Sequence, residues 1–386
     1  MKAIIKLCLV WILIVVESGC WDSKAIQNMA YVTAIGFEYK DEHFITYVQV
    51  LNFVNVAKSE QMEIGKNVPV WIGKGEGVTV AEALSSIYAT SQLRIHWGHV
   101  RAIICDEAIL KDNKKLAHVY DALNRYREIR YNILIYGTKE SFSEILAQKS
   151  IFNLSPLDTL MDSPEDINGQ KSSFPPQFGY KIIAQANEKG RTVFLPSISI
   201  TKQVWKEDQK KKPMFIIDGA YIIEEKQLAG WFSEEDLKGV RWFLKQTKRV
   251  FVTIPDHIKP IGTLVLTKPG HRIQPLIEKD TLRFNLYVEA RAYVEGMVEN
   301  VSVKTMEEQA AKVVRDEILT TYHKGLSKQT DLLNLFGEVY RNDPKVWQRL
   351  KDEGHLVLKE DTLNEIDVKV TIMHTGKYKG RVLPEN

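Results

Sequence analysis

The chain has 386 residues, 44% of them hydrophobic and 26% charged, a composition typical of folded proteins that excludes a disordered chain. The length is greater than one hydrophobic core supports, so we expect at least two domains. Lys and Arg number 52 against 49 Asp and Glu, and the formal net charge of +3 is far below the basic excess that nucleic-acid binding requires, which excludes nucleic acid as a partner.

Residues 1–19 have the layout of a secretory signal peptide. Two lysines precede ten uninterrupted apolar residues, 7–16, and the small residues Ser18 and Gly19 stand directly before Cys20. Ten residues are about half of what a ~30 Å hydrocarbon layer requires, so we do not expect a permanent transmembrane helix. A signal peptide cut at another position, or kept as an anchor, would also place the body of the chain outside the cytoplasm.

The small residue before Cys20 resembles a bacterial lipobox, in which the cysteine is lipidated and becomes the mature N-terminus. Cys20 is therefore the predicted lipidation site, although Glu17 stands where that pattern usually carries leucine. Cleavage before Cys20 removes Lys2, Lys6 and Glu17, which changes the net charge from +3 to +2. A near-neutral body offers little attraction to anionic lipid, so the anchor is the expected source of membrane attachment.

Residues 20–205 are predicted to form an N-terminal α+β domain that can be divided into two subdomains. A hairpin opens it, with strands at 30–37 and 44–53. Thr79 and Glu82 form a capping box for a helix over 80–92. Alternating strands and helices then indicate a sheet covered by helices; they are expected at 100–105, 116–123, 131–136 and 141–149.

Two further segments are predicted to lack regular structure. Residues 162–180 contain Ser163-Pro164, Asn168-Gly169 and Pro175-Pro176, and this concentration of turn formers predicts a long surface loop. Residues 206–213 are highly charged and include three consecutive lysines. Three lysines fall short of the usual basic cluster, so we expect a solvated linker or hairpin tip rather than a binding patch.

Residues 214–386 are predicted to form a C-terminal α+β domain, an antiparallel sheet packed with two or three helices. A strand at 215–223 and a helix capped by Ser233 begin it. Strands at 282–289 and 366–372 alternate apolar and polar residues, so each buries one face. The helices between them are expected at 306–322, at 332–340 and from Asp343-Pro344 onward.

The sequence contains no recognisable catalytic motif, since GxxxxGK[ST], GxSxG, HExxH and paired CxxC are all absent. Gly73, Gly75 and Gly77 lack the spacing of a dinucleotide fingerprint and predict a loop. His96 and His99 could share a metal, but no third ligand stands nearby in the sequence, so we expect structural histidines. We therefore predict no catalytic residue, no cofactor and no metal site.

Neighbouring charged residues have structural explanations as well. The pair Glu234-Glu235 suits the positive end of a helix dipole. Arg125, Arg127 and Arg130 suit the negative end of a preceding helix, although they could also bind an anion. Only Cys105 belongs to the body of the protein besides the predicted anchor, which excludes a disulfide scaffold.

Gly19-Cys20-Trp21-Asp22, followed by AYVTAIGF at 30–37, resembles the start of the Ger(x)C family, the C subunits of spore nutrient germinant receptors in endospore-forming bacteria. Three further likenesses occur in the family's order. They are Gly98-His99-Val100 before the strand at 101–105, the arginine-bounded segment 125–130, and GAYIIEEKQLAGWF at 219–232 with the helix start at 233–235. The likeness therefore extends over nearly the whole mature chain.

This resemblance implies a lipoprotein on the outer face of the spore inner membrane that works with integral membrane A and B subunits. It also implies an α+β fold of several subdomains without enzymatic activity. Two alternatives remain open. One is a free-standing extracytoplasmic solute-binding lipoprotein, and the other is an exported hydrolase or metal enzyme that brings His96 and His99 to a distant carboxylate.

Overall fold

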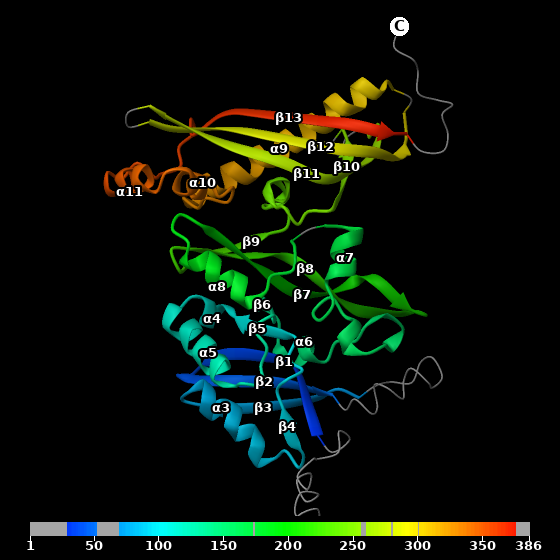
Figure 1. Ribbon diagram of the computed structural model, residues 1–386. Helices are drawn as coiled ribbons and strands as arrows, with labels where there is room; N and C mark the ends of the chain where they lie inside the picture. The colour runs from blue at the N-terminus through cyan, green and yellow to red at the C-terminus, as the bar shows by residue number, and fades with distance from the viewer. Residues whose placement is uncertain are drawn as a thin grey trace, which may run out of the picture.

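Two β-sheets organise the chain, and helices lie against their faces (Figure 1). The structure is a computed structural model that describes residues 29–51, 69–172, 174–255, 260–278, 281–299 and 301–375. Mixed sheets combined with helices confirm the expected α+β fold.

The first sheet contains nine strands. They are β1 (Met29–Lys40), β2 (His43–Leu51), β3 (Trp71–Gly77), β4 (Arg94–His96), β5 (Ala102–Asp106), β6 (Leu134–Thr138), β7 (Thr192–Glu207), β8 (Lys210–Glu224) and β9 (Gln227–Ser233). Their order is β3-β2-β1-β5-β6-β7-β8-β9, and β4 pairs with β1. The pairs from β1 through β5 and β6 to β7 are parallel, whereas the pairs on either side of this central part are antiparallel.

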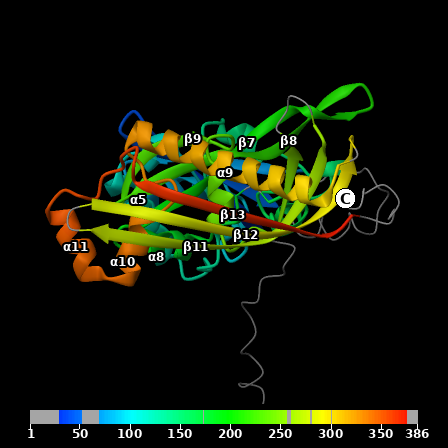
Figure 2. The ribbon, with the colours of Figure 1, turned by 90° about the horizontal axis from the view of Figure 1, so that it is seen from above.

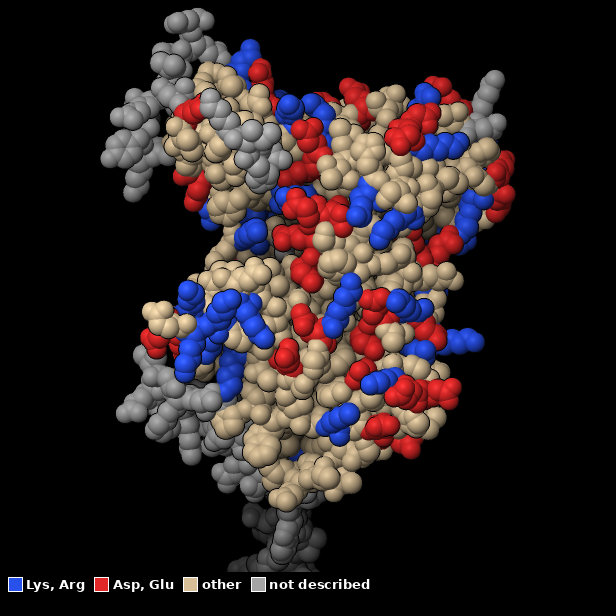
Figure 3. All heavy atoms as spheres, turned by 180° about the vertical axis from the view of Figure 1, so that it is seen from behind, with Lys and Arg blue, Asp and Glu red and all other residues tan. Residues whose placement is uncertain are grey.

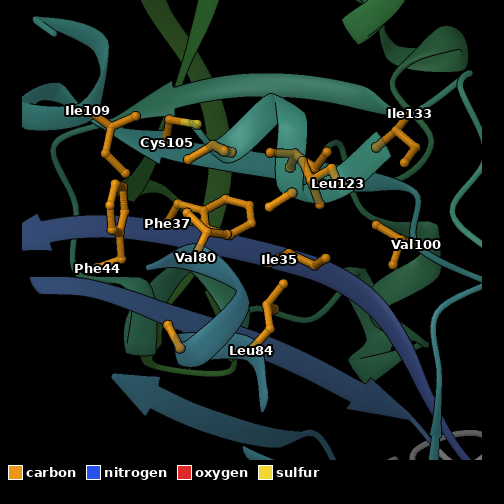
Figure 4. Packing of buried hydrophobic residues seen from close by; sticks show 14 of the residues in the cluster. Ile35, Phe37, Phe44, Val80, Leu84, Val100, Cys105, Ile109, Leu123 and Ile133 are labelled. Carbon is orange, nitrogen blue, oxygen red and sulfur yellow. The ribbon is translucent and has the colours of Figure 1, made fainter. Parts of the chain in front are cut away.

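Helices bury both faces of this sheet. They are α3 (Val80–Ser86), α4 (Glu107–Leu110), α5 (Asn113–Arg125), α6 (Phe142–Leu146) and α8 (Gly179–Asn187), with 3-10 turns η3 (Ile87–Ala89), η4 (Ile151–Asn153) and η5 (Pro156–Asp158). The short helix α7 (Glu165–Gln170) instead contacts the second sheet. On β5, Ile103 and Cys105 face the core under α3, α4, α5 and α8 (Figure 4), whereas Ala102 and Ile104 face the core under α6. A strand buried on both faces is apolar throughout, as the central strands of parallel sheets are.

The second sheet contains β10 (Arg249–Ile254), β11 (Gly262–Glu278), β12 (Thr281–Met297) and β13 (Leu363–His374), in that order. Its helical elements are η6 (Lys238–Phe243), α9 (Val303–Lys328), α10 (Leu335–Asn342) and α11 (Pro344–Asp352). The predicted antiparallel sheet packed with helices is confirmed for β10 to β12. The last strand, β13, pairs in parallel with β12, because the helices between them carry the chain back to the same end of the sheet. Figure 2 shows α9 running along β13.

Several predicted elements are confirmed with shifted ends. The opening hairpin pairs Lys40 with His43, and residues 52 and 53 of its expected second strand lie outside the described residues. Thr79 caps α3, because its hydroxyl accepts a hydrogen bond from the Glu82 backbone N–H at 3.1 Å, but the α-helix ends at Ser86 rather than near residue 92. Asp343 caps α11 with Pro344 in the first turn, as expected.

Two predicted loops are wrong. Residues 162–180 contain α7 and the start of α8, and Asp162 and Ser172 are buried. Ser172 packs against the second sheet, where its backbone N–H donates to the Arg249 carbonyl at 2.9 Å. The alternating glycines lie in β3, against which α3 packs so closely that a Cβ at Gly75 would be 2.0 Å from the Ala83 carbonyl oxygen.

The first sheet extends beyond residue 214, where the sequence predicts the start of the second domain. Residues 206–213 are the tip of the hairpin formed by β7 and β8, and β8 and β9 complete the first sheet. Ser233 and Asp236 make reciprocal capping hydrogen bonds of 3.1 and 3.2 Å, but a turn and η6 follow instead of an α-helix. The second sheet begins only with β10.

The connector between the sheets, residues 234–248, is held against α9. The Glu317 carboxylate of α9 accepts a hydrogen bond from the Arg241 guanidinium at 2.6 Å and another from the Trp242 indole N–H at 2.8 Å. Burial raises the pKa of Glu317, while the charge of Arg241 opposes that rise. Gly239 allows the close approach, since a Cβ there would lie 2.7 Å from the Glu317 carbonyl oxygen.

Replacing Glu317 with alanine should destabilise the protein by about 3 kcal/mol, because Arg241 and Trp242 would keep buried donors without an acceptor. Chemical denaturation measures the loss as a lower midpoint. Glu308→Ala, at an exposed position of the same helix, is the control and should change the free energy of unfolding by less than about 0.5 kcal/mol. Equal effects of the two substitutions would contradict a special role for Glu317.

Candidate functional site

The predicted lipidation site, Cys20, lies outside the described residues, as does Glu17. The described structure begins at Met29 in β1, and residues 21–28 connect it to Cys20. Covalent geometry limits this connection to at most about 30 Å. In the described part of the chain, no helix combines the length and the apolar character that crossing a bilayer requires.

His96 and His99 lie together against Tyr31 of β1. The Tyr31 ring centroid is 5.6 Å from that of His96 and 5.1 Å from that of His99, with both pairs edge to face. Glu128 Oε2 lies 3.0 Å from His96 Nδ1 and accepts the Trp97 backbone N–H at 3.0 Å. Burial, together with the neighbouring charges of His96 and Arg130, lowers the pKa of His99. These contacts tie the turn after β4 to the segment after α5, which is a structural role.

No arrangement of metal ligands accompanies the two histidines. Among the residues that the structure describes, no group of three or more His, Cys, Asp or Glu side chains could hold a metal ion. Of the three arginines near the end of α5, Arg125 pairs with Asp121 on the helix surface at 2.8 Å. Arg127 and Arg130 instead line an apolar pocket.

This pocket, with a volume of about 330 Å³, lies between α5, α8 and the first sheet. Its walls are largely aliphatic and come from both helices and from four strands; they include Ile103, Leu116, Val119, Leu123, Ile133, Ile182, Leu195 and Ile223. Tyr120, Tyr131 and Tyr180 also line it, and Tyr131 is 81% exposed. A mostly apolar pocket of this size with a few polar groups suits a small apolar ligand.

The pocket offers binding chemistry but no nucleophile. Cys105 also lines it, and complete burial strongly raises the pKa of this thiol, so the reactive thiolate is disfavoured. Sequence reasoning missed the pocket because its walls come from segments spread from residue 103 to residue 223. The available signal is the apolar side of the helix predicted at 116–123, because Leu116, Val119 and Leu123 line the pocket.

Two carboxylates meet where the first sheet contacts the chain before α10. Glu224 Oε1 accepts the Asp331 backbone N–H at 2.7 Å and the Thr192 hydroxyl at 3.2 Å. Burial, reinforced by the charge of Asp331, raises the pKa of Glu224 to about 7. Burial also raises the pKa of Asp331 to about 6, against the effect of backbone N–H donors such as that of Phe336. The two residues are 107 positions apart, so no sequence pattern joined them.

Because the folded protein holds these protons more tightly than the unfolded chain, its free energy of unfolding should fall as the pH rises from about 4.5 to about 7. Glu224→Gln keeps the acceptor oxygen and removes the charge. The variant should be more stable than the parent at pH 8, on the order of 2 kcal/mol, and similar to it at pH 5. Thermal unfolding across this range, with exposed Glu365→Gln as control, measures the effect; parallel profiles for Glu224→Gln and the parent would contradict it.

Family models match the chain in two consecutive parts. A model described as "Spore germination protein N-terminal domain" matches residues 22–200, and one described as "Spore germination B3/GerAC like, C-terminal" matches residues 218–376. The second match begins within β8, so it includes strands that complete the first sheet.

Whole-length relatives agree with these matches. Spore germination protein KC of Bacillus subtilis (strain 168) is 21% identical and is aligned over 96% of this chain and 97% of its own. Spore germination protein B3 of the same organism is 20% identical, with the same two shares. The crystal structure of the GerBC protein has the same fold, with a TM-score of 0.52 at 15% identity over 88% of this chain and 96% of that one. The chain therefore belongs to the Ger(x)C family of spore germination receptor C subunits.

Proposed function

We propose that this chain is the membrane-anchored C subunit of a nutrient germinant receptor and that it works by assembly with integral membrane A and B subunits. The observation that carries the proposal is the match of two family models, in order, over residues 22–200 and 218–376. Relatives are matched over 97% of their own length. The resemblance thus extends to the whole architecture of a C subunit rather than to one module.

The chemistry of the described residues supports binding rather than catalysis. Glu224 and Asp331, two carboxylates whose pKa values are raised by burial, hydrogen-bond to backbone N–H groups where two parts of the fold meet. Cys105 is a fully buried thiol whose raised pKa disfavours nucleophilic attack. His96 packs on Tyr31 and contacts Glu128. Each of these groups has a structural role, which fits a protein that acts through its surfaces.

Cys20 is the proposed lipid anchor, and residues 21–28 would tether the body to the outer face of the membrane. The apolar segment 7–16 directs export but is too short to remain as a membrane span. The thioether-linked lipid would then hold the mature chain at the spore inner membrane.

Replacing Cys20 with alanine should release the protein from membranes or block its maturation, because the modified sulfur is removed. Fractionation and intact-mass measurement provide the readout: the parent should sediment with membranes and carry added lipid mass. Cys8→Ala, inside the apolar segment, is the matched control and should keep both properties. Unchanged membrane retention and unchanged mass in the Cys20 variant would refute the lipid anchor.

Assembly is tested by crosslinking in intact spores. The parent chain should be recovered attached to integral membrane receptor subunits, identified by mass spectrometry. Recovery of the chain without such subunits, under conditions that crosslink other membrane complexes, would contradict the proposal.

A second function, solute binding by a free-standing lipoprotein, is favoured by the apolar pocket between α5 and α8. A ligand that binds only the folded state raises the melting temperature, and the rise grows with the logarithm of the ligand concentration once that concentration exceeds the dissociation constant. If this function holds, aliphatic solutes should raise the melting temperature of the parent. They should not change the melting temperature of Leu123→Trp, in which the larger indole side chain fills the pocket. No ligand-dependent shift in the parent would count against the second function.

A further inference from the structure

The hairpin of β7 and β8 projects beyond the body of the first sheet (Figures 1 and 2), and its outer end is positively charged. Residues 202–212 contain five lysines and two acidic residues. This excess of three positive charges equals the formal net charge of +3 of the entire chain. Figure 3 shows lysine and arginine side chains gathered at mid-height on the edge where the hairpin projects. The near-neutral composition therefore conceals one strongly cationic segment.

Exposed apolar side chains accompany the lysines. Val204 and Trp205 on the hairpin are 70% and 50% exposed. The adjacent turn η4 and the residue after it add Ile151, Phe152 and Leu154, which are 36%, 68% and 46% exposed. Phe152 has a φ of +59°, a backbone region that a bulky side chain rarely occupies. The turn thus presents an aromatic ring to solvent at a conformational cost.

Side-chain hydrogen bonds join the turn to the hairpin. Asn153 donates to Glu207 Oε1 at 2.9 Å and accepts from Lys212 Nζ at 2.6 Å, and Lys212 also pairs with Glu207 Oε2 at 2.7 Å. Lys149 lies close enough to Lys212 for the charge of Lys212 to lower its pKa, in addition to the larger effect of burial. Residues 149–154 and 202–212 therefore form one continuous region, which we call the hairpin surface.

We propose that the hairpin surface binds the headgroup layer of an anionic lipid bilayer. Lysines reach lipid phosphates while their stems and the neighbouring apolar side chains enter the interface, where tryptophan is especially favoured. Each lysine near such a surface adds electrostatic attraction. An acidic protein fits less well, because interfaces between proteins are depleted in lysine.

This contact goes beyond the proposed function, since it needs neither Cys20 nor another subunit. A chain that begins at Trp21 omits the signal peptide and the anchor but contains every described helix and strand. It should sediment with vesicles of phosphatidylglycerol and phosphatidylcholine and not with vesicles of phosphatidylcholine alone. Raising the salt to about 0.5 M should weaken binding at least about tenfold, because screening shortens the range of the attraction.

Two matched variants locate the contact. Each variant lacks four exposed lysines, and circular dichroism checks that each one is folded. The test variant combines Lys202→Gln, Lys206→Gln, Lys210→Gln and Lys211→Gln, and the control variant combines Lys304→Gln, Lys312→Gln, Lys345→Gln and Lys369→Gln. The test variant should bind anionic vesicles at least about tenfold more weakly than the parent, and the control within about twofold of it.

Trp205→Ala should lower the binding that persists at high salt, because it removes apolar insertion and leaves every charge in place. Equal losses in the test and control variants would overturn the proposal by showing attraction to overall charge alone. A parent that does not prefer anionic vesicles would also overturn it. Either failure leaves the Cys20 anchor untouched, because the chain under test lacks that residue.

Discussion

The buried carboxylate of Glu317 is the interaction on which the two-sheet arrangement depends. The connector that leaves β9 must cross to the second sheet, and it carries Arg241 and Trp242, whose polar groups need partners once they are buried. Glu317 supplies an acceptor to both from a single position on α9. Gly239 brings the connector backbone against the same helix turn, so these contacts hold the connector firmly on α9. The chain that leaves the first sheet is thereby tied to the helix that covers the second sheet.

The rest of the contact between the sheets mixes apolar and titratable groups. Val240 and Leu332 join the core that also contains Phe194 of β7, so the hydrophobic packing continues from the first sheet into the second unit. Beside this core, Glu224 and Asp331 bring two carboxyl groups together with raised pKa values. This junction has a packed part that resists separation and a polar part whose charge changes near neutral pH.

Charge along this chain is informative only when it is placed in space. The composition indicated a near-neutral body with little attraction to anionic lipid. The lysines of residues 202–212 are already neighbours in the sequence. The fold places them on one projecting hairpin and joins them through Asn153 to exposed apolar residues that lie about fifty positions earlier. A net charge is a sum over all surfaces, whereas a bilayer or a partner meets only one of them.

Local patterns were sufficient for the elements whose own residues decide their structure. The opening hairpin, the cap at Thr79, the helix start at Asp343-Pro344 and the alternation in β12 and β13 follow from hydrogen bonds and side-chain periodicity within a few residues. The family likeness was equally readable from short motifs in order. Sequence also indicated the export segment and Cys20, which depend on linear chemistry alone.

Only the tertiary structure decided the features that depend on distant contacts. The pattern of Gly73, Gly75 and Gly77 predicts a loop, but these glycines form a strand because α3 packs too closely on it for larger side chains. Residues 162–180 likewise have the composition of a surface loop, but Ser172 is buried where it hydrogen-bonds to Arg249. The apolar pocket, the Glu224–Asp331 pair and the hairpin surface each combine residues from separate segments. The sequence by itself therefore determined the class, the family and those local elements whose structure depends on neighbouring residues. The boundary between the sheets and every candidate binding surface came from long-range packing, because burial and partners are properties of the assembled chain.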